Sequence, residues 1–237
     1  MDQPHPDSWR DTPLYAPLLA ASEAADGCFV IARTAQSLDG YIATRDGESC
    51  WIGGSEDLAH THRLRSLCDA VVVGSATVRS DNPQLTTRLV PGPSPVRVVL
   101  DTERRLAVHY RVFGDGPETL LFCAPDVAGD PIHGAARAVK VRRGPFGLDI
   151  EAIVATLADR GLRRIMIEGG GFTVGSFLQA GALDRLHVTV APLLMGGGIP
   201  AFPLSPVDRL ADAPRFTWTV HRFGGDVVLD IPLIRCL

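Results

Sequence analysis

Residues 164–171, with the sequence RIMIEGGG, decide the fold class of this chain. The first four residues, Arg164 and the apolar residues 165–167, are interpreted as a buried β-strand. Glu168 and three glycines follow directly, and a helical pattern then covers residues 172–180 until Gly181 stops it. A buried strand that turns through glycines into a helix is typical of α/β folds. The backbone amides of such a turn suit an anionic ligand, and a plain turn without a ligand is an equally good interpretation.

Outward from this turn, apolar strands alternate with helical patterns along most of the chain. The strands are apolar throughout rather than half polar, so we expect helices to cover both faces of the sheet. The sequence therefore predicts an α/β three-layer domain with a mostly parallel central sheet and a C-terminal antiparallel hairpin. Strands are expected at residues 29–34, 71–74, 96–100, 119–123, 138–141, 164–167 and 186–191 and in the hairpin 216–223 and 226–231, and helices at 56–67, 75–79, 149–160 and 172–180.

The length of 237 residues is enough to bury one core. Residues 1–27 are interrupted by prolines and are interpreted as an N-terminal lead-in segment, with a short helix as an option over residues 18–25. Residues 28–237 form the predicted domain. No apolar run reaches the roughly 18 residues of a membrane span, and the first residues lack the basic and apolar regions of a signal peptide. We therefore expect no membrane partner.

Composition and spacing narrow the function classes further. A net charge of -4 argues against general binding to nucleic acid. The five cysteines are widely spaced without a CxxC pair, so we expect free thiols in a reducing cytoplasm and no metal site. His60 and His62 are two residues apart on the predicted helix, so they do not face one metal ion, and we expect them at the surface. We also expect a packed His187 and an N-cap at Ser55.

Other polar residues are candidates for binding a ligand. Thr77 and Asp81 are four residues apart and share a face if this segment is helical. Arg65 and Arg88 are fork-shaped cations that suit a phosphate, although each alone is more often a solvated surface charge. Trp51 is either an aromatic wall for a flat ring or a filler of the core or of a dimer contact.

Three blocks of sequence carry a resemblance to a known family. They are SLDGYIATRDGESCWI at residues 37–52, HTHRLRSLCDAVVVGSATVRSDNPQLTTR at residues 60–88, and IMIEGGGFTVGSFLQAGALDRLHVTVAPLLMGGG at residues 165–198. In this order and at these intervals they resemble the pyrimidine reductase domain of bacterial riboflavin biosynthesis, a member of the dihydrofolate-reductase-like superfamily. The likeness runs from about residue 29 to the C-terminus.

The resemblance implies that NADPH reduces the ribosyl group of 5-amino-6-(5-phosphoribosylamino)uracil, a phosphorylated small molecule, to the ribitylamino product. The sugar accepts hydride at C1′ in an imine or aldehyde form, and the proton donor is Glu168, Asp39 or a bound water. Cofactor contacts transfer by motif to Ala35, Trp51, Thr77, Asp81, Gly170, Gly171, Phe172, Thr173, Val174, Gly175 and Ser176. Substrate contacts transfer to Ser49, Arg65, Leu85, Arg88 and Glu168. The family likeness also implies a homodimer, for which the terminal hairpin is a candidate interface.

Two departures from the family pattern bear on function. Relatives often have a lysine where this chain has Arg33, and an arginine does not readily give up a proton. The zinc deaminase of bifunctional relatives needs H-x-E and P-C-x-x-C motifs, which are missing here, so we expect a separate deaminase enzyme. A reductase for another pyrimidine or pterin substrate and a non-catalytic nucleotide-binding protein are the alternatives. Arg104 and Arg105 are candidates to meet a 2′-phosphate.

Overall fold

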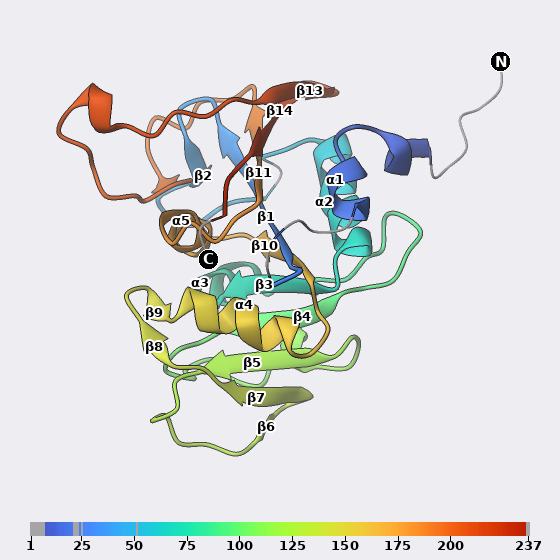
Figure 1. The fold of residues 1–237 in the computed structure, drawn as a ribbon, viewed down its shortest axis with the longest axis vertical. Coiled ribbons are helices and arrows are strands. Elements are labelled where there is room, and N and C mark those ends of the chain that lie inside the picture. The colour runs from blue at the N-terminus through green and yellow to red at the C-terminus, as the bar shows by residue number, and fades with distance from the viewer. Residues whose placement is uncertain (1–7, 21–23, 25, 51, 236–237) are drawn as a thin grey trace.

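The computed structural model describes residues 8–20, 24, 26–50 and 52–235 of the chain (Figure 1). These residues build one large sheet with the strand order β13-β14-β11-β1-β10-β3-β4-β5-β7-β6. Neighbours from β11 to β7 pair in parallel, whereas β14 and β13 at one edge and β6 at the other pair antiparallel. The parallel strands are β1 (Phe29–Ser37), β3 (Ala70–Gly74), β4 (Val96–Leu100), β5 (Thr119–Cys123), β7 (Ala136–Lys140), β10 (Arg164–Glu168) and β11 (Arg185–Ala191).

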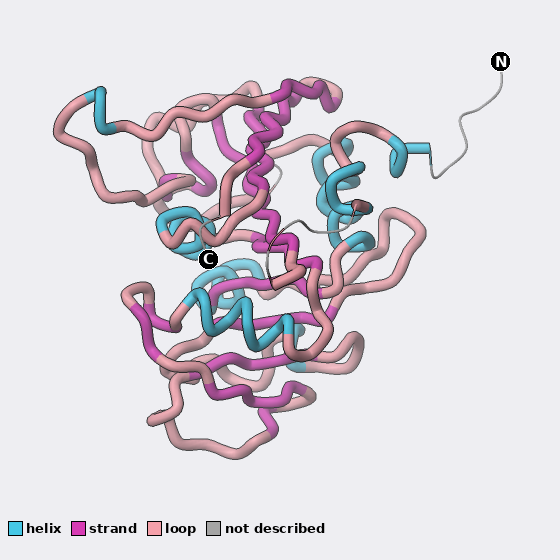
Figure 2. Tube along the Cα trace, in the orientation of Figure 1, coloured by secondary structure: helices cyan, strands magenta, loops and turns pink. Residues whose placement is uncertain are grey.

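The remaining strands lie at the edges of the large sheet or in two small two-stranded sheets (Figure 2). The antiparallel edge strands are β6 (Ile132–His133), β13 (Thr219–Phe223) and β14 (Asp226–Pro232). Two small sheets pair β2 (Tyr41–Ala43) with β12 (Ile199–Pro200) and β8 (Arg143–Gly144) with β9 (Gly147–Leu148). Short 3-10 helices cover Ser8–Asp11, Arg111–Phe113 and Leu210–Asp212.

Helices cover both faces of the sheet because side chains of a strand alternate between its faces. Ile165 and Ile167 of β10 pack into a core with α4 (Ile150–Ala158) and α5 (Gly171–Gln179). Met166, between them, packs into the opposite core with α1 (Ala16–Leu19), α2 (Ser55–Leu67) and α3 (Ser75–Asp81). The predicted fold class, an α/β three-layer domain with a mostly parallel sheet and a C-terminal antiparallel pair, is therefore confirmed.

Helix α2 differs from its predicted form in two respects. The helix begins at Ser55, one residue earlier than predicted, so its N-cap is Gly54 rather than Ser55, and the Gly54 N–H donates to Asp226 Oδ2 at 2.6 Å. His60 and His62 are both completely buried, so the expected surface location was wrong. The helix is covered on several sides: His60 lies against Tyr15 and His187, and His62 lies against the backbone of Arg88. His187 is packed, as predicted.

The segment before β1 also contributes to the core. Leu14, Tyr15 and Leu18 are buried in the cluster that contains Leu64 of α2. The Tyr15 hydroxyl and the His60 Nδ1 atom are 2.7 Å apart, and His60 continues the contact to His187 of β11. The short helix α1 occupies Ala16–Leu19, whereas the optional helix over residues 18–25 extends into positions outside the described residues.

We expect the Leu18→Ala variant to lower the free energy of unfolding by about 2–4 kcal/mol, because it leaves a cavity in a closed core. Leu18 is 0% exposed, whereas the adjacent Leu19 is 41% exposed. The matched control Leu19→Ala should therefore cost less than about 1 kcal/mol. Urea unfolding of the three proteins measures both values, and equal losses would show that the segment does not pack as described.

Candidate active site

The turn between β10 and α5 has a backbone that only glycine adopts easily. Gly169 and Gly170 have φ angles of +76° and +72°, which L side chains rarely adopt. A Cβ atom on Gly170 would lie 2.7 Å from Thr77 Oγ1, so the close approach of α3 also requires glycine. Gly170 is the N-cap of α5 and supplies no side-chain cap. The first amides of the helix therefore remain available to an anion at its positive end.

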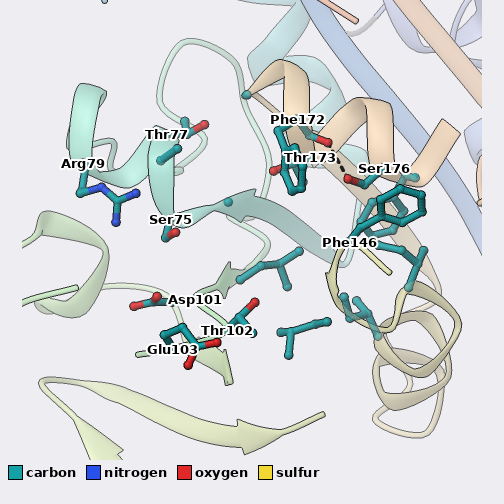
Figure 3. A pocket seen from close by; sticks show the side chains of 18 of the residues that line it. Ser75, Thr77, Arg79, Asp101, Thr102, Glu103, Phe146, Phe172, Thr173 and Ser176 are labelled. Atoms are coloured by element: carbon teal, nitrogen blue, oxygen red, sulfur yellow. Dashed lines mark hydrogen bonds between the residues drawn. The ribbon is translucent and has the colours of Figure 1, made fainter. Parts of the chain in front are cut away.

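A cavity of about 230 Å³ opens beside this turn (Figure 3). It lies between the start of α3, the segment after β4, the start of α4 and the first turns of α5. Phe146 and Phe172 provide aromatic surface, and Ser75, Thr77 and Thr173 provide hydroxyl groups (Figure 3). The cavity therefore combines flat apolar walls with donors, which is the usual make-up of a cofactor site.

The cavity brings together about half of the expected cofactor residues. Thr77, Gly170, Phe172, Thr173 and Ser176 line it. Trp51 lies outside the described residues. The others are not part of its lining. Ala35 is on β1, Asp81 ends α3, and Val174 is in the core. Gly171 lies against the carbonyl of Pro200, and Gly175 lies against Pro203 and Leu204.

Several lining residues were not identified as such from the sequence. They are Ser75, Arg79, Asp101, Thr102, Glu103 and Phe146. Arg105 lines the cavity as well, whereas its neighbour Arg104 donates to the Ile132 carbonyl at 3.2 Å. The residues after β4 could have been found from the sequence, because α/β sheets place their ligands at the carboxyl ends of parallel strands.

Two arginines and two acidic residues line the cavity, and they differ in their partners. Neither Arg79 nor Arg105 has an ion-pair partner within the described part of the chain. Glu103 is held by Arg143 at 2.5 Å. Asp101 is buried, and its carboxylate accepts the Leu106 N–H at 2.8 Å. Two guanidinium groups are thus available to an anionic ligand.

A buried ion pair lies on the other side of the glycine turn. Arg65 donates from Nε to Glu168 Oε2 at 2.7 Å, and its Nη2 donates to Oε1 of the same carboxylate. Nη1 donates to the Thr86 carbonyl at 2.9 Å. The two side chains are only 7% and 15% exposed. The bidentate geometry fixes the Glu168 carboxylate directly before the glycines.

The surroundings keep Glu168 ionised. Burial by itself would raise the pKa of Glu168, but the charge and hydrogen bonds of Arg65 outweigh it, so the pKa is lowered. Arg33 adds to this effect from β1, where it pairs in register with Glu168. Arg33 itself forms an ion pair with Asp57, which also accepts the Thr189 hydroxyl at 2.6 Å. Glu168 is therefore an acceptor of hydrogen bonds at neutral pH.

The expected substrate residues gather around this ion pair. Arg88 is exposed, and its guanidinium makes one long hydrogen bond, to Thr86 Oγ1 at 3.4 Å. Partial desolvation, followed by the nearby charges of Arg65 and Arg111, lowers the pKa of Arg88. Arg111 was not identified from the sequence; its N–H donates to Asn82 Oδ1 at 2.8 Å. A cluster of like charges with spare donors suits a phosphate.

The remaining candidate residues differ in their surroundings, and none of Ser49, Asp81, Leu85 and Asp39 lines the cavity. Ser49 Oγ lies 3.4 Å from Asp81 Oδ1. Leu85 is buried and has a φ of +56°. Asp39 is exposed, and its carboxylate accepts the N–H groups of Met195, at 3.1 Å, and Gly196, at 2.7 Å. Hydrogen bonds from Ser37 and from these amides lower the pKa of Asp39.

The residues present fit a dinucleotide cofactor. The glycine turn can receive a diphosphate because Gly170 lines the cavity and no side chain caps the first amides of α5, and the aromatic walls suit a flat base. Across the described residues, no group of three or more His, Cys, Asp or Glu side chains is placed to hold a metal ion. No described helix is both long and apolar enough to span a membrane.

Comparison with known proteins identifies the family. The chain is 37% identical over 209 residues to 2,5-diamino-6-ribosylamino-4(3H)-pyrimidinone 5′-phosphate reductase of Methanothermobacter thermautotrophicus, covering 85% of this chain and 96% of that one. It is 33% identical over 211 residues to the riboflavin biosynthesis protein RibD of Bacillus amyloliquefaciens, covering 85% of this chain but only 56% of the relative. The chain thus spans about half of RibD-type relatives.

Solved structures agree with this assignment. The Thermotoga maritima diaminohydroxyphosphoribosylaminopyrimidine deaminase/5-amino-6-(5-phosphoribosylamino)uracil reductase matches with a TM-score of 0.74 and 27% identity, covering 87% of this chain and 56% of that chain. The riboflavin biosynthesis reductase Rib7 of Saccharomyces cerevisiae shares the fold, with a TM-score of 0.69 and 22% identity, covering 90% and 92%. The family model described as RibD C-terminal domain matches residues 28–228. This chain therefore belongs to the RibD C-terminal domain family.

Proposed function

We propose that this protein uses NADPH to reduce the ribosyl group of 5-amino-6-(5-phosphoribosylamino)uracil to a ribityl group in riboflavin biosynthesis. The observation that carries the proposal is that the cavity and the Arg65–Glu168 ion pair adjoin the same glycine turn. Gly170 lines the cavity, and Glu168, two residues earlier, is held by Arg65. A cofactor in the cavity and a substrate beside Glu168 would therefore meet at this turn. The relatives named as reductases of phosphorylated ribosylaminopyrimidines support the same chemistry.

The cavity residues would hold the cofactor by its anionic groups. The free amides at the start of α5 suit the diphosphate, and Arg79 and Arg105 suit a 2′-phosphate. Phe146 or Phe172 would cover the adenine ring. The bound reduced nicotinamide supplies a hydride, which is the difficult part of the reaction. The protein contributes alignment and exclusion of water.

The ion-pair side of the turn would hold the substrate. Arg88 is an exposed cation without an acidic partner among the described residues, and it would take the 5′-phosphate. Arg65 retains N–H groups beyond those bonded to Glu168 and Thr86, so it can assist. Glu168 would accept a hydrogen bond from a sugar hydroxyl and fix C1′ in position.

The proton for the product would come from water. Reduction of the imine form adds hydride to C1′ and a proton to the attached nitrogen. Glu168 and Asp39 both have lowered pKa values and act as acceptors in the structure, so neither is poised as an acid. We assign Glu168 to orienting the sugar and Asp39 to fixing the loop at Met195 and Gly196.

The pyrimidine base of the substrate could be either of two compounds. The relative from M. thermautotrophicus, of which 96% is covered, is named for the 2,5-diaminopyrimidinone rather than the uracil. We therefore offer both compounds to the purified protein with NADPH and follow the absorbance of the reduced nicotinamide. Turnover of either supports the proposed reduction and identifies the base. The proposal would be contradicted if only a dihydropterin led to oxidation of NADPH, or if none of the compounds did.

We also propose a homodimer formed through the β13 edge of the sheet, in the cytoplasm, where reduced coenzyme is available. Strand β13 ends the sheet order, and Trp218 and Val220 are 55% and 54% exposed. An apolar, unpaired edge of this kind is suited to a second copy of the chain. The separate deaminase enzyme remains a prediction.

The Val220→Asp variant should convert the protein to a monomer, because it places a charge on the apolar edge. Val108 is 57% exposed outside the sheet and provides the control Val108→Asp. Sedimentation equilibrium measures the mass in solution. A wild-type monomer, or a dimer that survives Val220→Asp, would contradict this interface.

Replacing Glu168 with Gln should lower both stability and turnover. The free energy of unfolding should fall by about 2 kcal/mol at neutral pH, because Arg65 is left buried without its anion. Turnover should fall at least about tenfold with the KM for NADPH nearly unchanged. The control Glu151→Gln disrupts a pair whose side chains are 60% and 69% exposed, and it should cost less than about 0.5 kcal/mol.

The stability difference between wild type and Glu168→Gln should depend on pH. The folded-state pKa of Glu168 lies below its ordinary value of 4.5, so the stabilisation is complete above that pH and is lost as the pH falls through the lowered pKa. Urea unfolding across this range measures the difference. A constant difference would mean that the ion pair does not stabilise the fold.

The Arg105→Ala variant should raise the KM for NADPH about tenfold and leave the KM for NADH unchanged, because it removes one charged contact to the 2′-phosphate. Arg104→Ala is the matched control, since Arg104 does not line the cavity. Steady-state rates with NADPH and with NADH measure these KM values for both variants. Equal effects of the two variants would exclude Arg105 from the cofactor site.

A further inference from the structure

His62 is a buried polar residue of α2 whose role is not explained by the fold. Its side chain is 0% exposed. Its Nδ1 atom accepts the backbone N–H of Arg88 at 3.0 Å, so the neutral ring carries its proton on Nε2. Nε2 is buried and has no hydrogen-bond partner among the described residues. An unpaired buried donor destabilises a protein, and an apolar side chain at this position would avoid that loss.

The ring is kept in the form that can accept this hydrogen bond. Burial, followed by the charges of Arg65 and Arg88, lowers the pKa of His62 to about 4. The ring is therefore neutral at physiological pH, and the contact with the Arg88 amide persists.

The segment that His62 holds has a strained backbone. Leu85 has a φ of +56°, which is unusual for a branched side chain, although it is buried. Three hydrogen bonds fix the residues that follow it. Arg65 Nη1 donates to the Thr86 carbonyl at 2.9 Å, the Thr87 N–H donates to Ser94 Oγ at 3.0 Å, and the Arg88 N–H donates to His62.

The His62 contact acts on the residue that faces the substrate. The exposed Arg88 guanidinium makes a single long hydrogen bond within the described residues, so the backbone position of Arg88 determines the region that the guanidinium can reach. We propose that His62 is a positioning residue, which fixes the Arg88 backbone so that its guanidinium meets the 5′-phosphate of the substrate. This inference rests on the proposed function. It explains why a histidine with an unpaired Nε2 donor occupies this buried position: the histidine lowers stability but supports substrate binding.

Two substitutions at His62 separate positioning from a structural role. His62→Leu removes the acceptor and the unpaired donor, whereas His62→Asn keeps an oxygen near the place of Nδ1. The KM for the phosphorylated substrate should rise about tenfold in His62→Leu, the effect of one hydrogen bond, and should stay near the wild-type value in His62→Asn. kcat and the KM for NADPH should not change. The urea midpoint should be unchanged or higher in His62→Leu and lower in His62→Asn.

Two controls sharpen this test. The dephosphorylated riboside lacks the group that Arg88 binds, so its KM should be the same in wild type and His62→Leu. His60→Leu alters a buried histidine of the same helix that contacts Tyr15 and His187 instead of Arg88. It should lower the urea midpoint and leave the KM for the phosphorylated substrate unchanged.

An unchanged KM in His62→Leu, an equal rise with the riboside, or a folded His62→Asn that does not restore the KM would overturn the inference. If the wild type turns over none of the pyrimidines, the proposed function fails, and calorimetry with ribose 5-phosphate then tests His62 separately. Weaker binding to His62→Leu than to wild type and His62→Asn would support its role. Equal binding would overturn it.

Discussion

The bidentate ion pair between Arg65 and Glu168 is the interaction on which the arrangement of the site depends. It joins α2 to the end of β10, and the same guanidinium holds the Thr86 carbonyl of the segment that leads to Arg88. Removing two charges from water is costly, so a nearly buried pair is retained only where its geometry is good. Here one cation holds both the Glu168 carboxylate, directly before the glycine turn, and the backbone of Thr86.

Helix α2 is unusual because it buries polar residues on more than one side. Asp57, His60, His62 and Arg65 are all buried, and each makes a polar contact outside the helix. Asp57 and His60 face strands β1 and β11, while His62 and Arg65 reach the segment of residues 86–88. Polar contacts of this kind demand specific geometry, so they define the position of the helix more narrowly than apolar packing alone.

The fold was largely accessible from the sequence, and the site was accessible in part. Apolar strands such as β3 and β10 and the glycine turn have strong local signals, and the family resemblance supplied the expected substrate roles of Glu168, Arg65 and Arg88. The burial of His60 and His62 could not be inferred, because it depends on partners such as Tyr15 and the Arg88 amide that are distant in sequence. The roles of Arg79 and Phe146 depend in the same way on how α3 and the β8–β9 hairpin approach α5.

The central claim is that the coenzyme and the ion pair meet at the turn of residues 168–171. A crystal structure of the protein soaked with NADPH tests it most directly. We expect the diphosphate against the first amides of α5, with the nicotinamide directed toward Glu168. A diphosphate bound at a distance from residues 168–176 would contradict it.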